Sequence, residues 1–171
     1  MRSHESILPL LVIKWLANVG RWVQAIIRSN RLAKSSFEFS NIERLQFTDT
    51  NIAFDLLNDG YAGQVCKILG AVYGADAIEN LVFVGTGLSL LDGGMSYEGL
   101  AEAAISHRGL TDHQDIAEQL WTNLVGHAPK NAQVAPYVET LDSGSLSVGG
   151  LVSIAANHEL NTQNIDLTGT G

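Results

Sequence analysis

The stretch Leu91-Asp92-Gly93-Gly94-Met95-Ser96 decides the fold prediction, because a similar stretch returns about 51 positions later. There the chain reads Leu141-Asp142-Ser143-Gly144-Ser145-Leu146-Ser147, with the same Leu-Asp-x-Gly opening and a closing serine. A glycine suits the end of one helix, and a serine suits the N-cap of the next. The two stretches therefore predict two helical units with the same boundaries between helices.

The residues around these stretches extend the similarity. Residues 69–74 resemble residues 120–126, and residues 100–107 resemble residues 151–158. A period near 50 residues with apolar helical spacing is typical of stacked helical units. We expect units over about residues 62–107 and 112–158, although chance similarity between small apolar helices is an alternative.

Individual helix boundaries follow from the same signals. Apolar residues from Tyr61 onward fall at helical spacing, and Ser96 is an expected N-cap of a helix through Ser106. Thr111-Asp112-His113-Gln114 has the pattern of a capping box and predicts a helix through about Val125. Ser147 is the expected cap of the next helix.

Residues 42–56 have a different pattern. Two short alternating runs, residues 42–47 and 52–56, flank the turn-rich stretch Thr48-Asp49-Thr50-Asn51. This pattern predicts a β-hairpin. The expected fold class is therefore mainly α, with repeated helical units and a short hairpin near residues 42–56.

Residues 1–40 are predicted to form an amphipathic helix followed by a connector that starts near Arg31. Trp15, Val19, Trp22 and Ile26 fall on one helical stripe. Charged residues interrupt the apolar run, so we expect no transmembrane span. The stripe is expected to pack on the rest of the protein or on a neighbouring molecule, which makes self-association through it a candidate; a membrane surface is the alternative.

Composition excludes several classes of protein. The chain has 171 residues, of which 46% are apolar and 16% charged, so it is too apolar for a disordered chain. A single cysteine excludes a disulfide framework, and a net charge of −8 argues against nucleic-acid binding. The charge is uneven: residues 1–44 carry +4 and residues 45–171 carry −12. The acidic part attracts cations, although acidic residues also serve ordinary solubility.

The order of motifs resembles a known family. Residues 42–49 resemble its hairpin, residues 62–74 its first helix, and residues 84–97, 120–129, 141–144 and 160–167 follow in the same order. Over residues 41–171 the chain is similar to the bacterial domain-of-unknown-function family four-two-one-four. That resemblance implies a helical domain of exported calcium-binding proteins of the RTX (haemolysin) type and of S-layer-like proteins. It also implies an extracellular or cell-surface location, and it does not imply a reaction, since the family has no established catalytic residues. Residues 1–40 fall outside the resemblance. This segment is therefore a candidate for a part of the chain that is not native to the domain.

Candidate chemical sites are few. Asp49, Asp55 and Asp59 are the candidate ligands of calcium or another divalent ion, but an EF-hand would need an oxygen ligand at Leu57 and a glutamate at Cys66. A small hydrolase would use Cys66 or Ser89 as its nucleophile. His107 and His158 are expected near the ends of helices. Trp121 and Tyr137 are interpreted as core residues, with a sugar-binding platform as the alternative.

These observations favour a non-enzymatic structural or interaction module of an exported bacterial surface protein. Calcium or other divalent-cation binding is the first alternative and a small hydrolase is the second. We predict no catalytic residues and no cofactor other than calcium as a candidate. The expected partner is a protein or a glycan.

Overall fold

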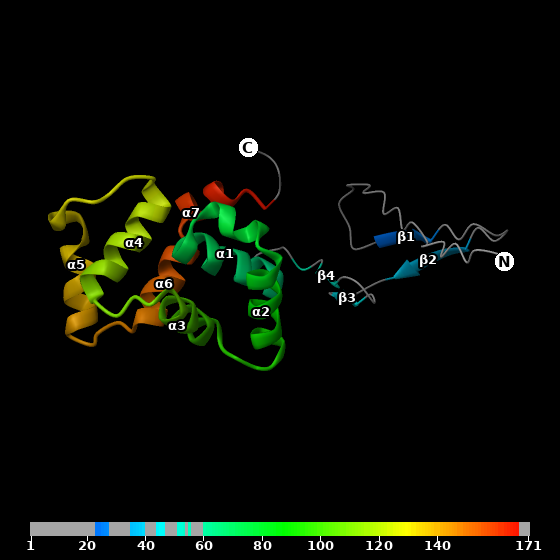
Figure 1. Cartoon of the computed structure of the whole chain (residues 1–171), viewed down its shortest axis with the longest axis horizontal. Coiled ribbons are helices and arrows are strands. Elements are labelled where there is room, and N and C mark those ends of the chain that lie inside the picture. Colours follow the sequence, from blue (N-terminus) through cyan, green and yellow to red (C-terminus); the bar gives the residue numbers. More distant parts are fainter. Residues whose placement is uncertain are drawn as a thin grey trace, which may run out of the picture. The chain divides into compact units, whose positions relative to one another are not determined.

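The computed structural model describes residues 23–27, 35–39, 44–46 and 51–53, Asp55, and residues 60–167. The chain divides into two units, Met1–Ile52 and Ala53–Gly171. Within the described residues the second unit is helical, which confirms the prediction of a mainly α protein. Figure 1 shows its helices.

Seven α-helices and one 3-10 helix follow one another in residues 61–165. They are α1 (Tyr61–Tyr73), η1 (Ala75–Glu79), α2 (Leu81–Asp92), α3 (Tyr97–Arg108), α4 (His113–Val125), α5 (Asn131–Asp142), α6 (Val148–Ala156) and α7 (Glu159–Ile165).

Two strands in the first unit correct the prediction of a helix at residues 23–27 and of a connector at residues 35–39. The rest of the predicted amphipathic helix lies outside the described residues. Strands β1 (Val23–Ile27) and β2 (Ser35–Phe39) pair antiparallel, from Val23 opposite Phe39 to Ile27 opposite Ser35. Ile26 therefore lies in a strand, and the predicted connector contains a second strand. β-Branched and aromatic residues are enriched in both strands, and this preference outweighs the helical spacing of the stripe. Trp15, Val19 and Trp22 lie outside the described residues.

Strands β3 (Arg44–Gln46) and β4 (Asn51–Ala53) form a second two-stranded sheet. Both fall within residues 42–56, where the sequence predicts a hairpin. The connecting residues 47–50 lie outside the described residues, so the hairpin itself stays a prediction.

Helix α1 forms the centre of the helical unit. Ten of its residues are buried, and α2, α3, α4, α6 and α7 all pack against it (Figure 1). A helix that is apolar on nearly every side must be covered all round. The other helices supply that cover, so the core follows α1.

The N-caps confirm most of the predicted boundaries. Ser96 Oγ accepts from the Gly99 N–H at 3.0 Å, and Ser147 Oγ accepts from the Gly150 N–H at 2.9 Å. The cap of α4 is Asp112, one residue after the predicted Thr111; its carboxylate accepts from the N–H groups of the second and third helical residues. Aspartate is a strong N-cap, and a negative charge there also favours the helix dipole.

Helices α3 and α6 approach closely because Gly149 has no side chain. A Cβ at that position would lie 2.5 Å from the backbone oxygen of Glu98 and 2.8 Å from Cγ of Glu102. These separations are too short for any larger residue. The close contact places α6 firmly against α3, and α6 also packs on α1.

Candidate functional site

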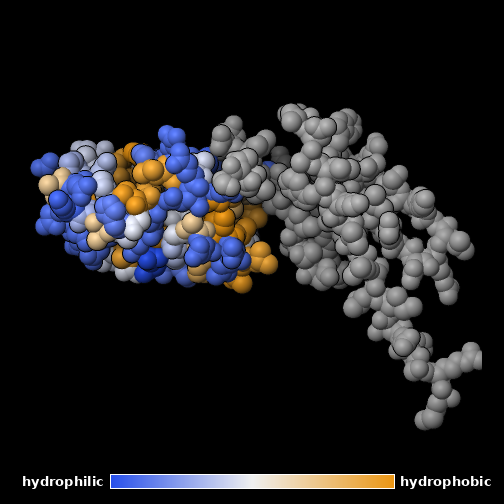
Figure 2. Space-filling model, turned by 90° about the horizontal axis from the view of Figure 1, so that it is seen from above, coloured by the Kyte–Doolittle hydropathy of each residue, from blue (hydrophilic) through white to orange (hydrophobic). Residues whose placement is uncertain are grey.

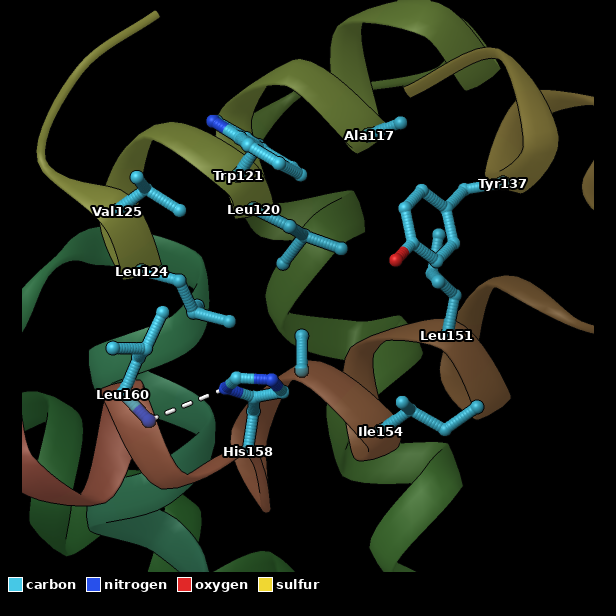
Figure 3. Close-up of a pocket in the computed structure, with 11 residues that line it drawn as sticks. Ala117, Leu120, Trp121, Leu124, Val125, Tyr137, Leu151, Ile154, His158 and Leu160 are labelled. Atoms are coloured by element: carbon cyan, nitrogen blue, oxygen red, sulfur yellow. Dashed lines mark hydrogen bonds between the residues drawn. The ribbon is translucent and has the colours of Figure 1, made fainter. Parts of the chain in front are cut away.

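An apolar groove lies between α4, α5, α6 and α7 (Figure 3). Its volume is about 210 Å³. Ten of its eleven lining residues are apolar or aromatic and one is a histidine: Ala117, Leu120, Trp121, Leu124, Val125, Tyr137, Leu151, Ile154, Ala155, His158 and Leu160. Concave, mostly apolar surfaces of this kind are the usual places where proteins bind ligands and peptide side chains.

Helix α4 supplies one wall of the groove. Leu120 is buried, and Trp121 and Leu124 on the same helix are half-buried. Leu124 lies four positions after Leu120 and three after Trp121, and both spacings make neighbours on a helix surface, so these three form one continuous apolar strip. The strip is deep at Leu120 and open to solvent at its margin.

The opposite margin is exposed. Tyr137 on α5 is 44% exposed, Ile154 on α6 is 57% exposed and Leu160 on α7 is 38% exposed. Figure 3 shows the side chains of Tyr137, Ile154 and Leu160 around the same hollow that Trp121 borders. Large apolar side chains that stay in water around one concavity are the usual mark of an interaction surface.

His158 contributes the polar group of the groove. Its Nδ1 accepts the Leu160 N–H at 3.2 Å, so His158 is the N-cap of α7. A neutral ring that accepts at Nδ1 carries its proton on Nε2. Since Nδ1 is occupied, Nε2–H is the donor that this ring can offer to a bound molecule.

Helix α7 is held in place by buried polar contacts with α1. Asn161 is 1% exposed, and its Nδ2 donates to the backbone oxygens of Lys67 and Ala156 at 2.9 and 2.8 Å. Lys67, itself buried, donates from Nζ to Asn157 Oδ1 at 3.2 Å. The Oδ1 of Asn161 has no hydrogen-bond partner among the described residues, so the amide is fixed through its two Nδ2 bonds. Buried hydrogen bonds of this kind orient the elements that they join. These bonds position Leu160 and His158 at the groove.

The indole N–H of Trp121 is buried and has no hydrogen-bond partner within the described residues. An unmet donor of this kind lowers stability. The ring of Trp121 nevertheless forms part of the groove wall, where a large flat apolar surface favours binding.

The interpretation of Tyr137 as a core residue is wrong, because its side chain is nearly half exposed. Trp121 is half-buried rather than internal. Apolar helical spacing identifies the side of a helix that faces other residues. It does not tell a closed core from an open groove, because both need the same pattern.

The two histidines expected at helix ends have different roles. His107 lies in the last turn of α3, with Nδ1 2.8 Å from Oη of Tyr73. His158 instead begins α7, so it contacts a helix N-terminus. The sequence contains no helix signal strong enough to predict the seven-residue α7, and His158 is an uncommon cap.

The predicted metal ligands are only partly described. Asp49 and Asp59 lie outside the described residues. Asp55 precedes α1, and its backbone oxygen accepts the Gly63 N–H at 3.2 Å. Among the described residues no three acidic, histidine or cysteine side chains gather in a metal-binding arrangement. Calcium binding by these aspartates stays a prediction.

The two candidate nucleophiles lie on different helices. Cys66 is buried in α1, and burial raises the pKa of its thiol, with the nearby Asp55 carboxylate adding to the rise. A catalytic thiol needs the opposite shift. Ser89 lies on the exposed side of α2, away from the groove. The structure does not bring Cys66 and Ser89 into the groove.

None of the helices in the described part of the chain is both long enough and apolar enough to cross a bilayer. Comparison of the chain with protein-family models, with curated proteins and with solved structures finds no match. The family resemblance stays a prediction.

Proposed function

We propose that the helical unit is a non-enzymatic interaction module that binds a partner through the groove between α4, α5, α6 and α7. The observation that carries the proposal is the set of exposed apolar side chains at its margin, Tyr137, Ile154 and Leu160. Removal of these side chains from water on binding would supply the affinity, at about 25 cal/mol per Å² of apolar area.

The wider setting is part of the same proposal. The resemblance of residues 41–171 to a domain of exported bacterial proteins supports an extracellular or cell-surface location. The helix order supports two related units, since α1 to α3 and α4 to α6 each contain three α-helices, with η1 as an addition in the first, and Ser96 and Ser147 cap the third α-helix of each. Detection of the chain on intact cells or in the culture medium of its source organism tests the location.

Binding in the groove can be tested with a peptide and one fluorophore. Trp15→Phe and Trp22→Phe in the full chain leave Trp121 as the only tryptophan. The probe is an acetylated peptide with a central phenylalanine–leucine pair and serines on both sides. We expect saturable changes in Trp121 fluorescence as the peptide is added.

A matched pair of variants locates the binding site. Ile154→Asp places a charge at the groove, whereas Leu81→Asp places the same charge on α2 at a leucine that is 81% exposed. Neither side chain is buried, so both variants should fold. Loss of binding in Ile154→Asp alone supports the proposal; equal binding by both variants contradicts it.

A further inference from the structure

The helical unit has an unusual balance of charge. Residues 60–167 contain twelve acidic and three basic residues, a net charge of −9. Of the three basic residues, Lys67 is buried and bonded to Asn157, and Arg108 is half-buried with its guanidinium 5.4 Å from the ring centre of Tyr73. Lys130 is the exposed basic side chain that remains in this part of the chain. A molecule that approaches the unit therefore meets a negative field.

Two acidic residues lie close, along the chain, to residues that line the groove. Glu118 precedes Trp121 by one helical turn on α4, and residues three apart are neighbours on a helix surface. Glu159 directly precedes Leu160 at the start of α7 and is exposed. The lining itself contains neither lysine nor arginine. Neither carboxylate lines the groove itself: Glu118 borders a separate hollow beside Asp115 and accepts from Gln114 Nε2 at 2.6 Å, and Glu159 accepts from Gln163 Nε2 at 3.0 Å. The two carboxylates belong to the helices that form the groove, and they add to the negative field around it.

The size of the hollow limits what enters it. A volume of about 210 Å³ is somewhat larger than a cavity of about 150 Å³ that holds one benzene molecule. One aromatic or branched aliphatic side chain fits such a space, whereas a whole helix does not. The remaining residues of a bound segment would lie over the margin of the groove, within the negative field of the unit.

We propose that the partner is a cationic peptide segment, which inserts one aromatic or branched aliphatic side chain into the groove and places lysine or arginine side chains near Glu118 and Glu159. This inference rests on the proposed function of the groove. Apolar burial provides most of the affinity, and the charges provide selectivity and a faster encounter.

Other occupants conflict with the charge. An acidic segment is repelled by a unit with a net charge of −9. A second copy of the unit carries the same charge, so an α4–α7 surface that met its own copy would bring like charges together. A cationic segment has no such penalty and gains from the negative charge of the unit.

Three peptides with one central phenylalanine–leucine pair test the inference on the full chain with Trp121 as the only tryptophan. Their flanks contain two lysines, two serines or two glutamates on each side. We expect the lysine peptide to bind most tightly and the glutamate peptide most weakly. The preference should shrink as salt is raised, because exposed charges are screened over about 10 Å at 0.1 M ionic strength.

Two double variants with the same change of net charge locate the effect. The double variant Glu118→Gln, Glu159→Gln should lower the affinity for the lysine peptide by about 3- to 10-fold, which is the size expected for the loss of two ion pairs at the surface. Asp76→Asn with Glu79→Gln changes two exposed residues of η1, which does not line the groove, and should have a smaller effect. Serine-peptide binding should be unchanged in both.

The outcomes separate the two proposals. Equal binding of all three peptides overturns the cationic partner and leaves the groove as a docking site. If none of the three peptides binds, both proposals are overturned. Equal weakening by the two double variants assigns the preference to the overall charge and overturns the role of Glu118 and Glu159. If Trp121 fluorescence changes with protein concentration when no peptide is present, a second copy of the chain occupies the groove and the inference is overturned.

Discussion

Replacement of Gly70 by alanine tests how α7, one wall of the groove, is placed against α1. A Cβ at this position would collide with Cγ2 of Ile165 and would lie 2.8 Å from Oδ1 of Asn161. Ile165 is β-branched and 3% exposed, and Asn161 is held by two hydrogen bonds, so neither side chain moves easily. Gly70→Ala must therefore displace α7.

The expected magnitude combines two opposing terms. Overpacking of a buried contact costs about 1–3 kcal/mol. An alanine inside a helix recovers up to about 1 kcal/mol relative to glycine. Because both contacts are with constrained side chains, we expect a net loss of about 1–2 kcal/mol in the free energy of unfolding.

Gly85→Ala is the matched control. Gly85 lies inside α2, and a Cβ there would meet no atom within 4 Å. The same substitution should then stabilise the protein by about 0.5–1 kcal/mol. Since about 1 kcal/mol corresponds to about 4 °C for a unit of this size, a difference of about 2 kcal/mol between the variants separates their melting temperatures by about 8 °C.

Thermal unfolding of the full chain, followed by circular dichroism at 222 nm, measures the difference. Gly70→Ala should melt below the parent protein and Gly85→Ala above it. If Gly70→Ala is stabilised as much as Gly85→Ala, α7 does not pack on α1 as described. The placement of Leu160 at the groove would then also be wrong.

Three further predictions concern the cap, an alkaline titration and the thiol. His158→Ala should cost about 1 kcal/mol in urea unfolding, and His158→Asn should restore most of it, because asparagine is also a good N-cap; equal losses would contradict the capping role. Burial raises the pKa of Tyr97 to about 12 from its ordinary value near 10. Above the ordinary value the unfolded chain loses the phenolic proton first, so stability should fall as pH rises from about 10 toward 12, less steeply in Tyr97→Phe; identical slopes would refute this. Cys66 should react slowly with iodoacetamide in the native protein and rapidly in urea, because burial raises the pKa of its thiol; fast native alkylation would show an accessible thiolate.

The helix boundaries were the most predictable part of the fold. Ser96, Ser147 and the stretch Asp142-Ser143-Gly144 act locally, through hydrogen bonds to residues a few positions away, so their effect can be inferred from short stretches of sequence. The strand Val23–Ile27 was not predicted. Its apolar residues also fit a helical stripe, and the pairing with Ser35–Phe39 depends on a partner that the local pattern does not specify.

The groove could be predicted only in part. Leu120 and Trp121 have an apolar helical pattern, but exposure of Tyr137 and Ile154 depends on how α5 and α6 are spaced. His158 and Leu160 lie beside α4 because Asn161 bonds to the backbone of α1, about ninety positions earlier in the chain. Contacts across such a sequence separation leave no local signal. Figure 2 shows apolar patches among hydrophilic side chains on one face of the helical unit.

The most direct test of the central claim is an NMR titration of the isotope-labelled full chain with the serine-flanked phenylalanine–leucine peptide. The groove account predicts saturable shifts of the indole N–H of Trp121 and of amides around Tyr137, Ile154 and Leu160, while residues of α2 stay unchanged. Absence of shifts, or shifts centred on another surface, would contradict the claim that this groove is where the protein binds its partner.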